Sequence, residues 1–134
     1  MTSLSLTVLD GTYTIHRLSS DSIPPTPVFS APFYSITRNA DELSIVIPQG
    51  LEIKSDNSEP GWACLRVAGT LDFSLVGILA GISSALAQAG ISIFAISTFD
   101  TDFILVKESS LERACEALGA AGYAVNMHYK KSKD

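Results

Sequence analysis

Hydrophobic and polar residues alternate along much of the first part of the chain. Residues 4–9 and 12–18 place apolar side chains at nearly every second position, which is the period of a half-buried strand. Asp10-Gly11 lies between them and is a favoured pair for two-residue turns with positive φ, so a hairpin is predicted. Residues 33–37 and 43–47 predict two further strands around a turn. This part of the chain is expected to be mainly β.

Two segments interrupt the alternation. Residues 19–32 hold four prolines, which deny backbone donors and disfavour a helix, so an irregular surface crossing is predicted. Residues 52–61 collect charge, Ser, Asn, Pro and Gly, and form the best candidate boundary. The predicted domains are therefore residues 1–60 and 61–134.

The hydrophobic period changes from two to that of a helix after a predicted strand at residues 62–67. Asp72 is expected to cap the helix by accepting a backbone N–H, and its charge suits the positive end of the helix dipole. Gly90 is well placed just beyond the helix end. One apolar face is formed by residues at helical spacing, namely Leu75, Ile78, Leu79, Ile82, Leu86 and Ala89.

The rest of the chain predicts two strands, a second helix and a last strand. Residues 91–98 and 102–106 read as strands around a short turn, and Ser109 with Glu112 predicts a capping box. Gly122 is expected to end the second helix, and residues 123–129 form the last strand. The order β-α-β-β-α-β predicts an α+β, ferredoxin-like fold with a four-stranded antiparallel sheet and both helices on one face.

Composition narrows the classes of protein. The hydrophobic fraction of 46% and charged fraction of 17% predict a buried core. The net charge of −5 argues against nucleic acid as a partner. The first ten residues lack a secretory signal pattern, and the apolar run at 75–89 is too short and interrupted for a membrane span. Cys64 and Cys115 are expected to be buried reduced thiols, which fits a cytoplasmic protein.

No motif predicts a cofactor or a metal. His16 and His128 lack metal-ligand spacing, and both are expected to lie on a surface or a sheet face. The sequence contains no nucleophile elbow, phosphate loop or dinucleotide fingerprint. A small enzyme is therefore not expected.

The start of the first helix is a candidate ligand site. Unpaired N–H groups and the dipole favour a carboxylate there, Gly77 permits close approach, and Asp72 can accept bonds from an amino group. This combination suits a zwitterion such as an amino acid. The alternative is that Asp72 only caps the helix and Gly77 only relieves packing.

A second polar cluster occupies the turn between the two middle strands. Its hydroxyls and carboxylates suit a ligand, but Asx and hydroxyl turns use the same residues without one. A carboxylate acid/base pair of Asp100 and Asp102 is conceivable, although strand alternation would direct nearby side chains apart. The cluster consists of Ser97, Thr98, Phe99, Asp100, Thr101 and Asp102.

These two stretches carry a resemblance to a known family. Asp72 with Gly77-Ile78-Leu79, and the run Ala85-Leu86-Ala87-Gln88-Ala89-Gly90-Ile91-Ser92-Ile93, resemble the first helix of ACT domains, small regulatory modules that bind amino acids. Residues 91–106 are similar to the branch that includes small bacterial tandem-ACT proteins and the cytosolic arginine sensors of animals. Residues 62–129 carry the resemblance, and the first sixty resemble a degenerate ACT-like half in outline. Four residues separate Asp72 from Gly77, as expected of that branch.

The resemblance implies a ferredoxin-like fold and an effector at an ACT–ACT interface. It implies a non-enzymatic sensor, a homodimer, that binds an amino acid or similar small ligand and has a regulated protein partner. The alternative is a ligand-free interaction module that dimerises or docks on a partner. The ligand-binding residues implied are Asp72, Phe73, Ser74, Leu75, Val76, Gly77 and Ile78, and, on the facing strand and turn, Phe94, Ile96, Ser97, Thr98, Asp100, Thr101 and Asp102.

Overall fold

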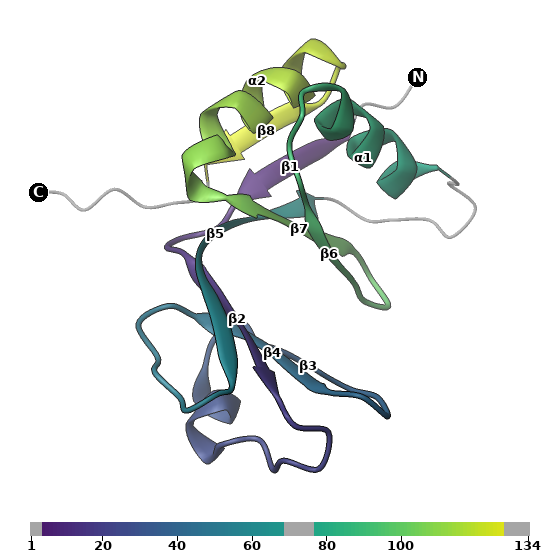
Figure 1. Ribbon diagram of the computed structural model, residues 1–134. Helices are drawn as coiled ribbons and strands as arrows, with labels where there is room; N and C mark the ends of the chain where they lie inside the picture. Colours follow the sequence, from purple (N-terminus) through teal and green to yellow (C-terminus); the bar gives the residue numbers. More distant parts are fainter. Residues whose placement is uncertain (1–3, 69–76, 128–134) are drawn as a thin grey trace, which may run out of the picture. The chain divides into compact units, whose positions relative to one another are not determined.

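The computed structural model describes residues 4–68 and 77–127, which fall into two compact units. We call Gly11–Trp62 the β unit, and Met1–Asp10 together with Ala63–Asp134 the α+β unit. Strand β5 (Asn57–Ala68) contributes its first residues to the β unit and its last to the α+β unit (Figure 1). The predicted division into domains 1–60 and 61–134 stays a prediction; the structure groups the first ten residues with the second part of the chain.

The β unit is an antiparallel sheet with strands in the order β3-β4-β2-β5. Its other strands are β2 (Tyr13–Leu18), β3 (Ser35–Arg38) and β4 (Leu43–Pro48). The predicted pairing of the third and fourth strands is confirmed. A short 3-10 turn, η1 (Thr26–Ser30), lies in the proline-rich crossing and buries Val28. The core of this unit consists of Leu18, Val28, Leu43, Ile45 and Ile47.

The predicted hairpin across Asp10-Gly11 is wrong. Strand β1 (Ser5–Val8) pairs with β5 and β8, whereas β2 pairs with β4 and β5. Gly11 does have positive φ, at 73°, as the Asp-Gly pair suggests. The chain turns there, but β1 and β2 pair with different stretches of the long strand β5 and not with each other.

Strand β5 also extends into the predicted boundary loop. It begins at Asn57, although Pro60 and Gly61 are residues that normally weaken a strand. The register with β2 shifts between Tyr13 and Ile15, so that β5 has one more residue than its partner there. Gly61 has φ of 83°, which a β-bulge accommodates. The bulge explains why a segment with loop composition forms part of the longest strand.

The α+β unit follows the predicted order β-α-β-β-α-β from β5 onward. Its further elements are α1 (Ile78–Gln88), β6 (Phe94–Ser97), β7 (Asp102–Lys107), the 3-10 turn η2 (Glu108–Ser110), α2 (Leu111–Ala120) and β8 (Ala124–Met127). The predicted four-stranded sheet needs one correction. Strand β1 lies between β5 and β8, antiparallel to the first and parallel to the second, so the strand order is β8-β1-β5-β7-β6.

Both helices cover one face of this sheet, as predicted (Figure 1). Every second residue of the central strands points into a shared core, because side chains alternate between the faces of a sheet. The two helices cover this core with their apolar faces. Its fully buried members include Leu6, Leu65 and Val67, Ile104 and Val106, Ile82 and Leu86, and Ala114 and Leu118.

The two helices begin at other residues than predicted. Helix α1 begins at Ile78 after Gly77, so the predicted start at Asp72 is wrong; Asp72 itself lies outside the described residues. The predicted capping box is also wrong, because Ser110 precedes α2 and makes no side-chain cap bond. The predicted end at Gly90 is confirmed. The N–H groups of Gly90 and Ile91 donate to carbonyls of the last turn at 2.9 and 3.0 Å.

Three smaller expectations concern the cysteines, the histidines and a membrane span. Cys64 and Cys115 are free; Cys64 is fully buried and Cys115 is half-buried. His16 lies on a face of the β-unit sheet and is buried, while His128 lies outside the described residues. Among the described residues, neither helix has the length and apolar character that crossing a membrane requires.

Candidate functional site

The polar turn between β6 and β7 is built by its own hydrogen bonds. Ser97 and Asp102 form the closing pair of the hairpin, and the Ser97 hydroxyl donates to Asp102 Oδ1 at 2.5 Å. Thr98 Oγ1 donates to the carbonyl of Thr101 at 3.1 Å and accepts from its N–H at 3.2 Å. The N–H of Thr98 also donates to that carbonyl, at 2.8 Å. The turn is therefore held in one shape without needing a ligand.

Thr101 attaches this turn to the centre of the sheet. Its side chain is buried, and its hydroxyl donates to the carbonyl of Val67 in β5 at 2.7 Å. Val67 lies just before residues 69–76, which lead to helix α1. The hydrogen bond thus brings the polar turn to the strand end from which the predicted ligand-binding segment departs.

The carboxylates of the turn differ in exposure. Asp100 is exposed at the tip, whereas Asp102 is half-buried at the start of β7. Asp102 receives the Ser97 hydroxyl on Oδ1, which leaves Oδ2 to accept from another donor. Phe99 at the tip is 80% exposed, so it does not fill a pocket in this unit. Asp102 is the better placed of the two carboxylates to bind an amino group.

The start of α1 offers backbone N–H donors, and of the predicted segment 72–78 the structure describes Gly77 and Ile78. Asp72, Phe73, Ser74, Leu75 and Val76 lie outside the described residues. Gly77 is the N-cap residue, with φ of 82°, and Ile78 is the first helical residue. The first N–H groups of a helix have no partner within it, and the helix dipole makes this end positive. Because glycine has no side chain to cap them, these groups are suited to an anion.

Strand alternation divides the remaining predicted residues between two faces of the sheet. In β7, Ile104 and Val106 belong to the core beneath the helices, so Phe103 and Leu105 point to the opposite face. Phe94 is opposite Leu105 and Ile96 is opposite Phe103, and cross-strand partners share a face. Phe94 and Ile96 therefore point away from the helices. Ser97 and Asp102 are on the helix-covered face, the same face as α1.

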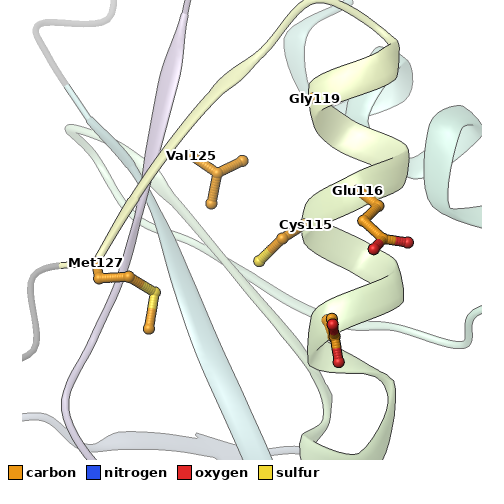
Figure 2. Close-up of a pocket in the computed structure, with 6 residues that line it drawn as sticks. Cys115, Glu116, Gly119, Val125 and Met127 are labelled. Carbon is orange, nitrogen blue, oxygen red and sulfur yellow. The ribbon is translucent and has the colours of Figure 1, made fainter.

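A different pocket lies beside α2 and was not found by the sequence reasoning. It has a volume of about 410 Å³ and contains none of the predicted residues. Figure 2 shows the thiol of Cys115 directed toward β8, which carries Val125 and Met127. Small residues at Cys115 and Gly119, four apart on α2, leave this space and are its one signal in the sequence. The pocket is lined by Glu112, Cys115, Glu116, Gly119, Val125 and Met127.

The cysteines are poorly suited to nucleophilic chemistry. Burial raises the pKa of the Cys64 thiol to about 12. Burial, with a smaller contribution from the charge of Glu116, raises the pKa of Cys115 as well. Both thiols are protonated at neutral pH, and the thiolate is the reactive form. Within the described residues, no group of His, Cys, Asp and Glu is arranged to hold a metal ion.

Each part of the chain matches a family model. Residues 57–120 match the family model described as an ACT domain, and a second family model, for an N-terminal domain, matches residues 11–50. The cytosolic arginine sensor for mTORC1 subunit 1 of Pongo abelii is 30% identical over 126 residues. That alignment covers 87% of this chain and 38% of the sensor, so the chain spans less than half of that relative.

Two solved structures are similar in fold to this chain. Protein Atu0741 from Agrobacterium tumefaciens is 36% identical, with a TM-score of 0.90, and the match covers 100% of both chains. The aspartate kinase of Clostridium acetobutylicum, an allosteric enzyme, matches 91% of this chain with 34% of its own length. Its TM-score is 0.66 at 17% identity, a likeness of fold alone.

Proposed function

Because this chain belongs to the ACT domain family, we propose that it is a regulatory protein that binds an amino acid. The match of residues 57–120 to the ACT domain model carries this proposal. The matched range includes the polar turn and the start of α1, which are also the places where the residues favour a zwitterion. The predicted ferredoxin-like fold, which the structure has, supports the same function.

The proposed site consists of residues 72–78 and the turn from Ser97 to Asp102. The amide groups at the start of α1 bind the carboxylate of the ligand, because the helix dipole favours an anion there. Oδ2 of Asp102 and the carboxylate of Asp72 accept bonds from the ligand amino group. Thr101 positions the turn through its bond to Val67. Thr98 and Asp100 shape the rim.

Phe94 and Ile96 have a different role in this proposal. They point to the face of the sheet that the helices leave uncovered, beside Phe103. Arg66 lies over the Phe103 ring on that face, 6.0 Å from the ring centroid. We assign this face to the ACT–ACT contact of a homodimer.

Arginine is the first ligand to test, because the relative from Pongo abelii is named as an arginine sensor. The charge of the turn suits this choice, since Asp100 and Asp102 contribute two carboxylates to the proposed site. The protein is proposed to be non-enzymatic and cytoplasmic, and to signal through a regulated partner protein.

Thermal shift measurements with the twenty amino acids test this function. A ligand present at a hundred times its Kd stabilises the folded state by about 2.7 kcal/mol, which is a readily measured shift. Calorimetry on the Asp102→Asn variant follows, because asparagine keeps Oδ1 for Ser97 and loses the charge. Loss of a bond to a charged group is expected to weaken binding about tenfold or more.

The matched control is Glu108→Gln, which removes one exposed carboxylate from the same unit outside the proposed site. It should leave binding unchanged. If no amino acid stabilises the protein at millimolar concentration, or if the control loses as much affinity as Asp102→Asn, the proposed site is wrong.

One observation favours a second function, that of an interaction module without a ligand. The hydroxyls of Ser97, Thr98 and Thr101 are all used within the protein, as in a purely structural turn. Light scattering distinguishes the two functions. A ligand-free module assembles equally with and without amino acids, whereas the sensor changes its assembly or its partner binding when the ligand is present.

A further inference from the structure

A separate pocket lies wholly within the β unit. Residues of β2, of β5 and of the segment after β4 enclose about 270 Å³, which is room for a small molecule. None of the residues of the proposed amino-acid site contributes to it. It is lined by Thr14, His16, Gln49, Leu51, Glu52, Ile53, Ser58 and Pro60.

His16 is the unusual member of this set. Its side chain is only 6% exposed, and Nδ1 lies 2.8 Å from the hydroxyl of Ser55. Among the described residues, no group makes a hydrogen bond with the other ring nitrogen, Nε2. A buried polar atom without a partner is costly, so such atoms in native proteins call for an explanation. A ligand that pairs with Nε2 would supply one.

The imidazole is in its neutral form at neutral pH, because burial lowers the pKa of His16 below its ordinary value. One ring nitrogen is then a donor and the other an acceptor. When Nδ1–H donates to the Ser55 oxygen, Nε2 has a free lone pair. A ligand with N–H groups selects that tautomer.

The charge of the lining residues indicates the sign of the charge that a ligand would carry. Glu52 carries the only full charge among the eight lining residues, and no lysine or arginine lines the pocket. Leu51, Ile53 and Pro60 offer apolar surface. The lining therefore combines one carboxylate, neutral hydrogen-bonding groups and apolar contacts.

Part of the wall is held in place by the protein itself. Oε1 of Gln49 accepts bonds from the Thr12 hydroxyl at 3.0 Å and from the Gly61 N–H at 2.9 Å. These bonds fix the amide between β2 and the bulge of β5. Rigid support of this kind is what a binding site needs to hold a ligand in one orientation.

We propose that this pocket binds a small organic cation, an alkylamine or alkylguanidine. The charged group pairs with the carboxylate of Glu52 and donates a hydrogen bond to Nε2 of His16. The alkyl part contacts Leu51, Ile53 and Pro60. This site is independent of the proposed amino-acid site, and it gives the β unit a binding role of its own.

Nitrogen NMR spectra of the chain, labelled with the NMR-active nitrogen isotope, test the proposal. Butylammonium chloride and ethylguanidinium chloride are titrated at constant ionic strength, and butanol serves as the uncharged probe. The cations should shift the ring nitrogens of His16 in a saturable way, with Nε2 as the acceptor. Butanol should shift them little at the same concentration. Equal binding of butanol, or an unchanged His16 ring, would overturn the proposal.

Two variants separate this site from the other. Glu52→Gln changes an exposed side chain, so the fold is kept, and it should weaken cation binding about tenfold or more. Glu108→Gln, with the same change of charge in the α+β unit, should not. Amino-acid binding should survive Glu52→Gln. Cation binding that is lost in Asp102→Asn and kept in Glu52→Gln would assign the cation to the other site and refute this one.

Discussion

Gly81 in helix α1 lies against the ring of Tyr123, and adding a single methyl group tests how tightly the two are packed. A Cβ atom built on Gly81 would lie 2.6 Å from Tyr123 Oη and 4.0 Å from Cζ. The first distance is a clash, and the second is ordinary van der Waals contact. The phenolic oxygen is therefore the atom that excludes a side chain at position 81.

The magnitude follows from two opposing terms. Replacing glycine by alanine inside a helix stabilises it by about 1 kcal/mol. Overpacking a well-filled site costs about 1–3 kcal/mol, and the Tyr123 hydroxyl can give way only by moving the ring out of its packing against the core. Gly81→Ala is therefore expected to destabilise the α+β unit by about 1 kcal/mol. In a Tyr123→Phe background the clash is gone, and the same substitution should stabilise by about 1 kcal/mol.

The assay is urea unfolding of the four proteins of this double-mutant cycle, followed by circular dichroism of the helices. The coupling free energy between the two positions is expected to be about 2 kcal/mol, well above the error of such cycles. Gly119→Ala is the matched control. Gly119 is also helical, but nothing lies within 4 Å of its added Cβ, so alanine should stabilise there without needing a second change.

Either of two results would refute the reasoning. If Gly81→Ala stabilises the protein with Tyr123 intact, as much as it does with phenylalanine, the hydroxyl does not set the limit. Destabilisation in both backgrounds would show that some other neighbour of position 81 resists the methyl group.

Three further predictions concern buried polar groups. Thr101→Val leaves the Val67 carbonyl without its hydroxyl donor and should destabilise the α+β unit by about 1–3 kcal/mol, with faster amide exchange in the β6–β7 hairpin; unchanged exchange would contradict it. Because burial lowers the pKa of His16 in the folded state, the unfolded state binds more protons, so stability should fall as the pH drops through 6.5 toward the folded pKa. In His16→Gln this part of the pH dependence of the unfolding free energy should disappear, and identical slopes would refute the assignment. With a pKa of about 12, Cys64 should resist iodoacetamide at pH 8 in the native protein and react after denaturation, as read by mass spectrometry.

The order of helices and strands in the α+β unit could be read from the sequence because it depends on local patterns. Apolar residues at helical spacing, such as Ile82 and Leu86, identified α1 and the face it buries. Gly90 ended that helix where its positive φ allows the chain to leave. The starts of the helices were less predictable, because several polar residues near each start could act as the cap.

Strand pairing was decided by the tertiary structure. Asp10-Gly11 has the composition of a hairpin turn, yet β1 pairs with β5 and β8, more than fifty residues away. Pro60 and Gly61 have the composition of a loop, yet a bulge includes them in β5. Which strands pair depends on the apolar surface that the whole fold buries. Distant segments contribute to that buried surface, and no local pattern describes them.

The features of the candidate site also fall into those that the sequence predicted and those that only the tertiary structure showed. The sequence by itself determined which residues form the polar turn and that a helix precedes it, but it placed the start of that helix at Asp72 instead of Ile78. Only the tertiary structure showed that Thr101 bonds to Val67, that Phe94 and Ile96 lie on the opposite face from Asp102, and that the His16 ring is buried. The reason is physical: periodicity specifies the faces of each element separately, whereas neighbours across a sheet depend on register and pairing. These are properties of the whole folded chain.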